Sequence, residues 1–348
     1  MATIPVAFPE DVKTAPLVTL KLDRLIQSDV QEQARLYEAS KALGFFYLDL
    51  RGCPEGESLL ASADILFNVA KDVFELPVEK KLTYDFAAQG KYFGYKGMGA
   101  EVIDGAGTRD RNEIYNISKD DILEIGESLP QPGLVNERRG LLKRYITQNN
   151  AVLQTLFNSF TQVMKLPSSS SLATRHRLSA PSGCHVRFIR APPQPPEQRQ
   201  TALGEHTDFG SLTILFNRIG GLQVLLPGSE EWVYVKPMPG CAIINLGDAM
   251  VKFTAGLLRS NLHRVVSPPG AQADLVRYSL VYFCRPEHDI KLGRLKGGDI
   301  DLVEGSAEEA DGESAQEWLK RRHLGRKVQF FKGSESWEGA KGTEGARL

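Results

Sequence analysis

The chain has 348 residues, of which 42% are hydrophobic, and its 42 basic and 43 acidic residues leave a formal net charge of −1. This length suits one large or two modest domains, and the even charge balance argues against a nucleic-acid or anionic-membrane surface. No stretch approaches the roughly 20 apolar residues of a membrane span.

The N-terminus and the cysteines indicate an intracellular protein. Residues 1–16 carry acidic residues and prolines where a signal peptide would have a basic start and an apolar run. Cys53, Cys184, Cys241 and Cys284 form no C-x-x-C pair, which argues against a thiolate zinc site and favours buried free thiols in a reducing compartment. We therefore expect a cytoplasmic protein. We also expect it to act on a small molecule and to need no obligate protein partner.

The first half of the chain is predicted to be mostly helical, with a few short strands. Apolar periodicity and β-branched content predict strands at 16–22 and 44–50, and helices at 30–43, 58–83 and 136–165. The glycine-rich segment 90–112 is predicted to be a loop.

The second half is predicted to be rich in strands. Short candidates separated by Gly, Pro and Asn turns lie at 185–190, 211–216, 221–226, 232–237, 240–248 and 276–283. Their spacing is typical of an antiparallel barrel or sandwich, and helices followed by a run of strands indicate an α+β protein. One further helix is expected at 315–324, before a Gly- and Glu-rich tail.

His206, Asp208 and His263 are candidate metal ligands. In a strand, residues i and i+2 point to the same face, so His206 and Asp208 can approach one ion together. An H-x-D pair alone is common, and a single histidine is more often structural. Together, two imidazoles and one carboxylate make the facial triad of non-haem iron(II) oxygenases, which leaves positions open for co-substrate and dioxygen.

Arg277 and Ser279 are candidate residues for binding a carboxylate group of a small molecule. They are again i and i+2 in a predicted strand, where a guanidinium can bind a carboxylate bidentately and a hydroxyl can add a hydrogen bond. The alternatives are a structural salt bridge for Arg277 and an ordinary strand position for Ser279.

Five motifs in order resemble the isopenicillin N synthase-like branch of the 2-oxoglutarate/iron(II)-dependent dioxygenases. They are HTDFGSLTILF from 206, GGLQV from 220, NLGD from 245, LHRV from 262 and RYS from 277, with GFFY from 44 and FGYKGMGAE from 93 in the first half. The resemblance runs from about residue 16 to about residue 325.

The resemblance implies a double-stranded β-helix, or jelly-roll, core flanked by helices. It implies an N-terminal region over 1–165 and a jelly-roll domain over 166–325, and the tail over 326–348 is expected to be disordered from its Gly- and Glu-rich composition. It also implies that His206, Asp208 and His263 bind Fe(II), that Arg277 and Ser279 bind 2-oxoglutarate, and that dioxygen is consumed, with ascorbate as an additional reductant. One departure is Ala191, which stands where many relatives have a tyrosine that helps to hold the co-substrate.

The substrate is expected to be a mostly apolar small molecule. Tyr92, Phe93, Tyr95 and Met98 lie in the glycine-rich segment, and Phe283 follows the RYS motif. Such a segment, over 92–104, can close over a substrate and exclude water, or it can simply pack onto the core. Relatives commonly serve specialised metabolism, so hydroxylation, desaturation or ring rearrangement of such a metabolite is expected.

Three alternatives remain open at this stage. A sister enzyme of the same branch takes electrons without using 2-oxoglutarate. A zinc hydrolase can use the same two histidines and carboxylate. A non-catalytic ligand-binding protein can keep the same fold.

Overall fold

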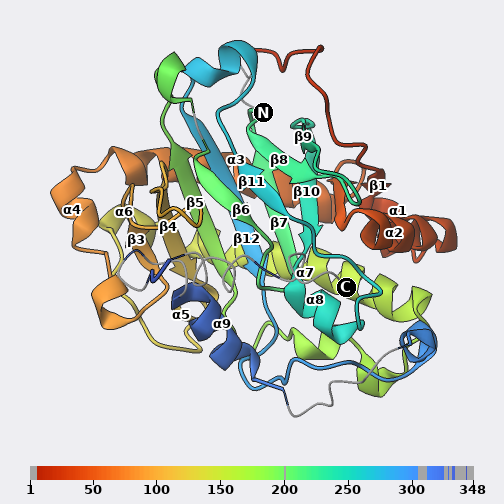
Figure 1. Cartoon of the computed structure of the whole chain (residues 1–348). Helices are drawn as coiled ribbons and strands as arrows, with labels where there is room; N and C mark the ends of the chain where they lie inside the picture. The colour runs from red at the N-terminus through yellow and green to blue at the C-terminus, as the bar shows by residue number, and fades with distance from the viewer. Residues whose placement is uncertain are drawn as a thin grey trace.

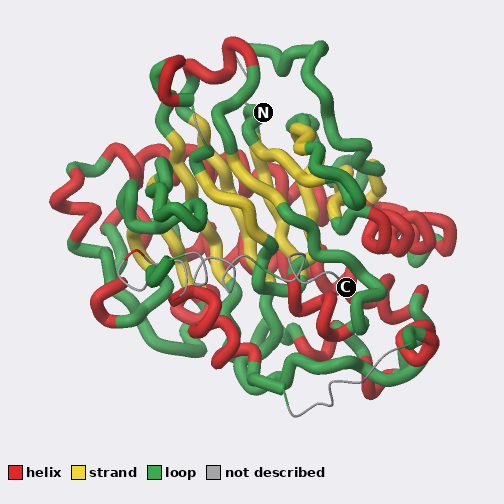
Figure 2. Tube along the Cα trace, viewed as in Figure 1, coloured by secondary structure: helices red, strands yellow, loops and turns green. Residues whose placement is uncertain are grey.

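The strands of the protein form two sheets at the centre of the fold. The computed structural model describes residues 6–199, 201–304, 312–324, 328, 331–333 and 342. The larger sheet has the strand order β1-β2-β10-β7-β12-β5-β4-β3, and the smaller has the order β6-β11-β8-β9. Helices lie around the central strands, and they pack on the larger sheet (Figure 2). This arrangement is the predicted α+β jelly roll.

The elements follow one another from an N-terminal helical part to a strand-rich part. The strands are β1 (Thr19–Lys21), β2 (Phe45–Asp49), β3 (Gly94–Lys96), β4 (Glu113–Ser118), β5 (His185–Ala191), β6 (Leu203–His206), β7 (Leu212–Asn217), β8 (Leu222–Leu225), β9 (Trp232–Tyr234), β10 (Cys241–Leu246), β11 (His263–Val265) and β12 (Arg277–Cys284). The helices are α1 (Leu22–Ile26), α2 (Val30–Ala42), α3 (Pro54–Glu75), α4 (Val78–Leu82), α5 (Lys119–Ile122), α6 (Gly133–Asn136), α7 (Arg139–Val163), α8 (Asp248–Phe253) and α9 (Ala315–Leu324).

Most predicted elements are present, and the differences have local causes. The helix expected over 58–83 is divided between α3 and α4 at Pro77, whose ring prevents a continuous helix. Strand β3 lies inside the segment predicted to be a loop, because its three residues pair with β4. Strand β4 was not predicted, since it is buried on both faces and shows no alternation of polar and apolar residues.

The N-terminal strands complete the larger sheet. β2 pairs antiparallel with β10, and β4 pairs antiparallel with β5. The two halves of the chain therefore share one sheet, and a domain boundary at residue 165 stays a prediction. The tail predicted over 326–348 lies mostly outside the described residues. Within the described part of the chain, no helix has the length and apolar character to cross a membrane.

Helices α3 and α7 cover one face of the larger sheet (Figure 1). Successive side chains of β12 point alternately to the two faces of the larger sheet. Leu280 and Tyr282 point into the large core shared with α3 and α7, whereas Val281 and Phe283 belong to the smaller core between the two sheets. Arg277 and Ser279 therefore lie on the inner, inter-sheet side of β12.

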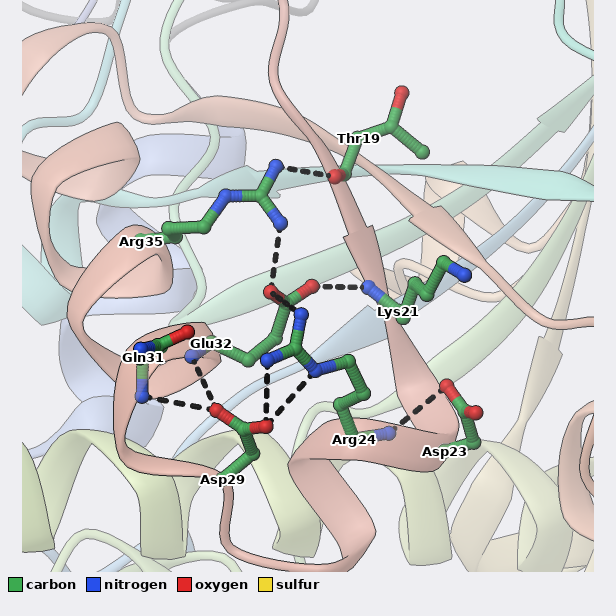
Figure 3. A network of polar contacts seen from close by, with 8 residues as sticks. All are labelled: Thr19, Lys21, Asp23, Arg24, Asp29, Gln31, Glu32 and Arg35. Carbon is green, nitrogen blue, oxygen red and sulfur yellow. Dashed lines mark hydrogen bonds and ion pairs between the residues drawn. The ribbon is translucent and has the colours of Figure 1, made fainter.

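A charged network fastens the first helices to strand β1 (Figure 3). Asp29 caps α2 by accepting hydrogen bonds from the amides of the first turn, and its carboxylate also accepts from Arg24 at 2.6 and 2.9 Å. Glu32 is fully buried and accepts from the amide of Lys21 and from Arg35, both at 2.6 Å. These contacts hold α2 against the edge of the larger sheet, where β1 pairs with β2.

Candidate functional site

Two short strands bring the predicted metal ligands together. His206 is the last residue of β6 and His263 the first of β11, and the two are direct partners across these antiparallel strands. Their ring centroids are 4.2 Å apart. Asp208 lies beyond the end of β6, so the prediction that it shares a strand with His206 is wrong. The three residues are all buried, and one ligand atom of each lies within 4.8 Å of the others.

The hydrogen bonds of the three side chains aim their remaining donor atoms at one point. His206 donates from Nδ1 to the Gly204 carbonyl at 2.8 Å, and His263 donates from Nδ1 to the Asn261 carbonyl at 3.1 Å, because a carbonyl only accepts. In a neutral imidazole with this hydrogen bond, Nε2 is the unprotonated nitrogen, which is the atom that binds a metal. These atoms lie 3.9 and 3.8 Å from Asp208 Oδ1.

The other oxygen of Asp208 is held by two strands of the larger sheet. Asp208 Oδ2 accepts from Thr213 Oγ1 on β7 at 2.6 Å and from Asn245 Nδ2 on β10 at 2.7 Å. Thr213 and Asn245 are themselves register partners. This arrangement leaves Oδ1 facing both imidazoles, and such outer hydrogen bonds orient the ligands of metal sites. The donor set of two nitrogens and one oxygen fits an iron site with open positions.

Two helices brace the loop that carries Asp208. The Asp248 amide at the start of α8 donates to the Asp208 carbonyl at 2.8 Å. The Asp248 carboxylate accepts from Thr207 at 2.9 Å and from Arg322 of α9 at 3.0 Å. The NLGD motif was noted in the sequence, but the role of Asp248 as a link between the loop and α9 was not predicted.

Arg277 and Ser279 lie together on the inner side of β12. Arg277 donates from Nη1 to Ser279 Oγ at 2.7 Å and from Nε to the Gly220 carbonyl at 2.8 Å. Arg277 is 3% exposed and Ser279 is 1% exposed. Among the described residues, no carboxylate forms an ion pair with Arg277. Burial lowers the pKa of Arg277 to about 10, so the guanidinium is still charged at neutral pH. A buried cation of this kind needs an anionic partner.

The backbone around Arg277 is shaped to admit the guanidinium. Gly221 has a φ of +109°, and a Cβ there would lie 3.1 Å from Arg277 Nε. Ala191 is the register partner of Arg277 on β5, so the small side chain that replaces the expected tyrosine stands beside the guanidinium.

Three of the five predicted substrate residues gather around one histidine. The ring of His185 on β5 lies 5.0 Å from Tyr92, 6.0 Å from Phe93 and 4.8 Å from Phe283, measured between centroids. Phe283 is the register partner of Thr213 on β7. The aromatic group therefore lies beside the strand whose Thr213 donates a hydrogen bond to Asp208. His185 was not predicted, since a single histidine in a strand carries no signal in the sequence.

The other two predicted substrate residues are placed differently. Tyr95 is only 4% exposed and donates from its hydroxyl to Glu113 at 2.7 Å, as expected for a residue that packs the segment onto the core. Met98 is 54% exposed. The structure therefore does not bring Tyr95 and Met98 into the aromatic group around His185, and their contact with substrate stays a prediction.

The segment 92–104 nevertheless lies against the metal-ligand strand. A Cβ on Gly204 of β6 would stand 2.1 Å from the carbonyl oxygen of Ile103, so the two backbones are in close contact two residues before His206. This placement is the one that a cover over the site requires, and movement of the segment stays a prediction.

Comparison with known proteins gives consistent matches along the chain. Residues 181–286 match the 2OG-Fe(II) oxygenase superfamily, and residues 16–132 match the N-terminal region described for non-haem dioxygenases in morphine synthesis. A 2-oxoglutarate-dependent dioxygenase of Aspergillus fumigatus is 33% identical, with 86% of this chain and 83% of that protein aligned. Another, from a Dothideomycetidae species, is 30% identical, with coverage of 87% and 92%.

Solved structures share the fold. A full-length Neurospora crassa protein in complex with α-ketoglutarate has a TM-score of 0.73 at 23% identity, covering 90% of this chain and 97% of that one. JOX2 in complex with 2-oxoglutarate, iron and JA has a TM-score of 0.68 at 21% identity, covering 98% and 94%. At this level of identity the likeness concerns the fold.

Proposed function

This chain belongs to the 2OG-Fe(II) oxygenase superfamily, and from that premise we propose that His206, Asp208 and His263 bind its catalytic iron. As a member of the isopenicillin N synthase-like branch, it is a dioxygenase that uses Fe(II), 2-oxoglutarate and dioxygen. The observation that carries the ligand assignment is the approach of both imidazole Nε2 atoms to Asp208 Oδ1, at 3.9 and 3.8 Å.

Arg277 and Ser279 are proposed to bind the carboxylate of 2-oxoglutarate that is remote from the metal. The support is a buried guanidinium with no acidic partner among the described residues, fixed by Gly220 and Ser279 on the inner face of β12. A planar guanidinium and a hydroxyl together offer the donors that a carboxylate accepts.

The protein controls the reaction by positioning its groups. Bound iron, together with 2-oxoglutarate and dioxygen, supplies the oxidant that removes hydrogen from a substrate carbon. Thr213 and Asn245 hold Oδ2 of Asp208, and the Nδ1 hydrogen bonds of the two histidines fix the orientation of their rings. The aromatic group around His185 is placed to bind substrate beside the ligands, and the packing of Ile103 on Gly204 helps to exclude water.

We propose a mostly apolar small molecule of fungal specialised metabolism as the substrate. The fungal relatives named above and the aromatic side chains Tyr92, Phe93 and Phe283 support this class. The reaction outcome is hydroxylation, desaturation or ring rearrangement of that substrate. We also propose a cytoplasmic location, since the cysteines Cys53, Cys184, Cys241 and Cys284 are all free.

Turnover of 2-oxoglutarate tests the proposal. Metal-free enzyme is reconstituted with Fe(II) or Zn(II), and succinate formation is measured with and without dioxygen. We expect succinate only with Fe(II), 2-oxoglutarate and dioxygen together, and none from His206→Ala, Asp208→Ala or His263→Ala, each with a melting temperature near that of wild type. Full activity of any two of these variants, with iron still bound, would contradict the ligand assignment.

A further inference from the structure

Two arginines beside the aromatic group lack a counter-charge. Arg285 follows β12 and is 5% exposed, while Arg187 on β5 is half-buried. Among the described residues, no carboxylate lies within ion-pair distance of either guanidinium, whereas Arg190, also on β5, pairs with Glu113. Glu101 lines the same pocket as Arg187.

Both guanidiniums converge on one place. The carbon Cζ of Arg187 lies 5.4 Å from the ring centroid of Tyr92 and 4.9 Å from that of Phe283, and Cζ of Arg285 lies 5.0 and 5.8 Å from the same rings. Both arginines also donate to the phenol oxygen of Tyr92, Arg285 at 3.3 Å. The shared contact shows that both guanidiniums can donate to acceptors in the same small region.

The donors of the pair are not used up by the protein. Arg285 donates from Nη1 to the Gly183 carbonyl at 2.6 Å, but its buried Nε has no hydrogen-bond acceptor among the described residues. Arg187 donates from Nε to Asn116 at 2.7 Å. Neutral acceptors do not compensate one buried and one half-buried positive charge, and such burial is costly unless an anion pairs with the charges. Burial raises the pKa of Tyr92, but the two arginines outweigh it and hold the pKa below its usual value.

This arginine pair is separate from the Arg277 site and borders the metal ligands. Arg277 and Arg285 stand at opposite ends of β12, about 25 Å apart along an extended chain. A Cβ on Gly210, two residues after Asp208, would lie 3.1 Å from Cγ of Arg285. Arg277 and Arg285 therefore lie at the two ends of one strand, and Arg285 lies next to the loop that carries Asp208.

We propose that Arg187 and Arg285 bind a carboxylate of the substrate, whose apolar body lies against Tyr92, His185 and Phe283. The inference rests on the proposed function and specifies its substrate class as small carboxylic acids with an aromatic or alicyclic body. Guanidiniums bind carboxylates through paired hydrogen bonds, and the aromatic faces provide the apolar contact. The arginines thus determine specificity and orient the substrate carbon toward the metal.

Benzoate and benzamide separate this charge recognition from apolar binding. Enzyme loaded with Fe(II) and saturating 2-oxoglutarate, without dioxygen, is titrated with each compound by calorimetry. Benzoate should bind in the millimolar range or tighter, and benzamide about tenfold more weakly or worse, since it lacks the charge. Equal binding of the two compounds, or no binding of benzoate in the millimolar range, would overturn the proposal.

Arginine variants locate the binding. Arg187→Gln and Arg285→Gln should each weaken benzoate binding about tenfold or more, while Arg285→Lys should be intermediate and covers the case in which Arg285→Gln does not fold. Arg190→Gln is the matched control, because Arg190 lies on the same strand but pairs with Glu113. Wild-type benzoate affinity in Arg187→Gln and in Arg285→Lys or Arg285→Gln would also overturn the proposal.

Two further readouts keep the interpretations apart. All these variants should bind 2-oxoglutarate as wild type does, and failure of wild type itself to bind iron and 2-oxoglutarate would refute the proposed function instead. The wild-type absorption spectrum at neutral pH should show no tyrosinate. A tyrosinate band that disappears in Tyr92→Phe would mean that deprotonated Tyr92 is the anion that pairs with the two arginines. The proposed carboxylate site would then be refuted.

Discussion

Replacing Thr213 by valine should weaken iron binding without disturbing the fold. The threonine hydroxyl donates to Asp208 Oδ2 at 2.6 Å, and Asn245 supplies the second hydrogen bond at 2.7 Å. Valine has nearly the same shape, and the residue is 4% exposed in the middle of the larger sheet, between β10 and β12. The change therefore removes one hydrogen bond and little else.

The size of the effect follows from the charge of the acceptor. A hydrogen bond to a charged group contributes roughly 1.5–3 kcal/mol, and its loss lets the carboxylate rotate away from the position between the two imidazoles. Because outer hydrogen bonds of this kind affect metal affinity by about tenfold to a hundredfold, we expect the dissociation constant for Fe(II) to rise by that factor. Activity at saturating iron should fall less than activity at limiting iron.

The assay is anaerobic titration of metal-free protein with Fe(II), beside thermal unfolding of the same samples. Thr161→Val is the control, because it removes a hydrogen bond to the Phe157 carbonyl in α7 and a longer one from the Leu172 amide, both away from the metal ligands. Both variants should melt near the wild-type temperature, and only Thr213→Val should lose iron affinity. Unchanged iron affinity in folded Thr213→Val would refute the view that Thr213 orients Asp208.

Three further predictions address the co-substrate, the covering segment and the pH dependence of stability. Arg277→Lys should weaken 2-oxoglutarate binding about tenfold or more in an anaerobic titration, because an ammonium cannot make the paired, planar hydrogen bonds of a guanidinium. An unchanged affinity would exclude Arg277 from the 2-oxoglutarate site. Gly204→Ala should displace Ile103, because the carbonyl oxygen of Ile103 would lie 2.1 Å from the new Cβ. The loosened segment should then be cleaved faster by trypsin after Arg109. An unchanged cleavage rate would show that this contact does not hold the segment in place over the site. Burial lowers the pKa of His176 to about 4 from its ordinary value of 6.5, so the unfolded chain binds more protons between these values and the free energy of unfolding should fall as the pH drops from about 6.5 toward 4. His176→Gln should flatten this dependence in denaturant titrations at several pH values, and an identical slope in the variant would contradict it.

The elements that the sequence predicted well are those with a strong local pattern. The long helices α3 and α7 have apolar residues at helical spacing, and β5, β7, β10 and β12 are rich in β-branched and aromatic residues. The strands that were missed, β3, β4, β6 and β11, are short or buried on both faces. Their pairing partners lie far away in the chain, and no local pattern records those partners.

The identity of the candidate ligands was determined by the sequence alone, since few residue types bind iron and the motifs around His206, Asp208 and His263 occur in a specific order. Which oxygen of Asp208 faces the imidazoles was decided by the tertiary structure, because Thr213 and Asn245 come from two other strands.

The arginine pair is a second feature that the tertiary structure decided and the sequence did not predict. Arg187 and Arg285 are ordinary charged residues in the sequence, and nothing in their spacing indicates that they share a site. Only the antiparallel pairing of β5 with β12 places them over the same rings of Tyr92 and Phe283, where neither forms an ion pair with a described carboxylate. The sequence indicated the reaction class through its ordered motifs and the family that they resemble, whereas charge compensation depends on distance in space and is decided only by the folded chain.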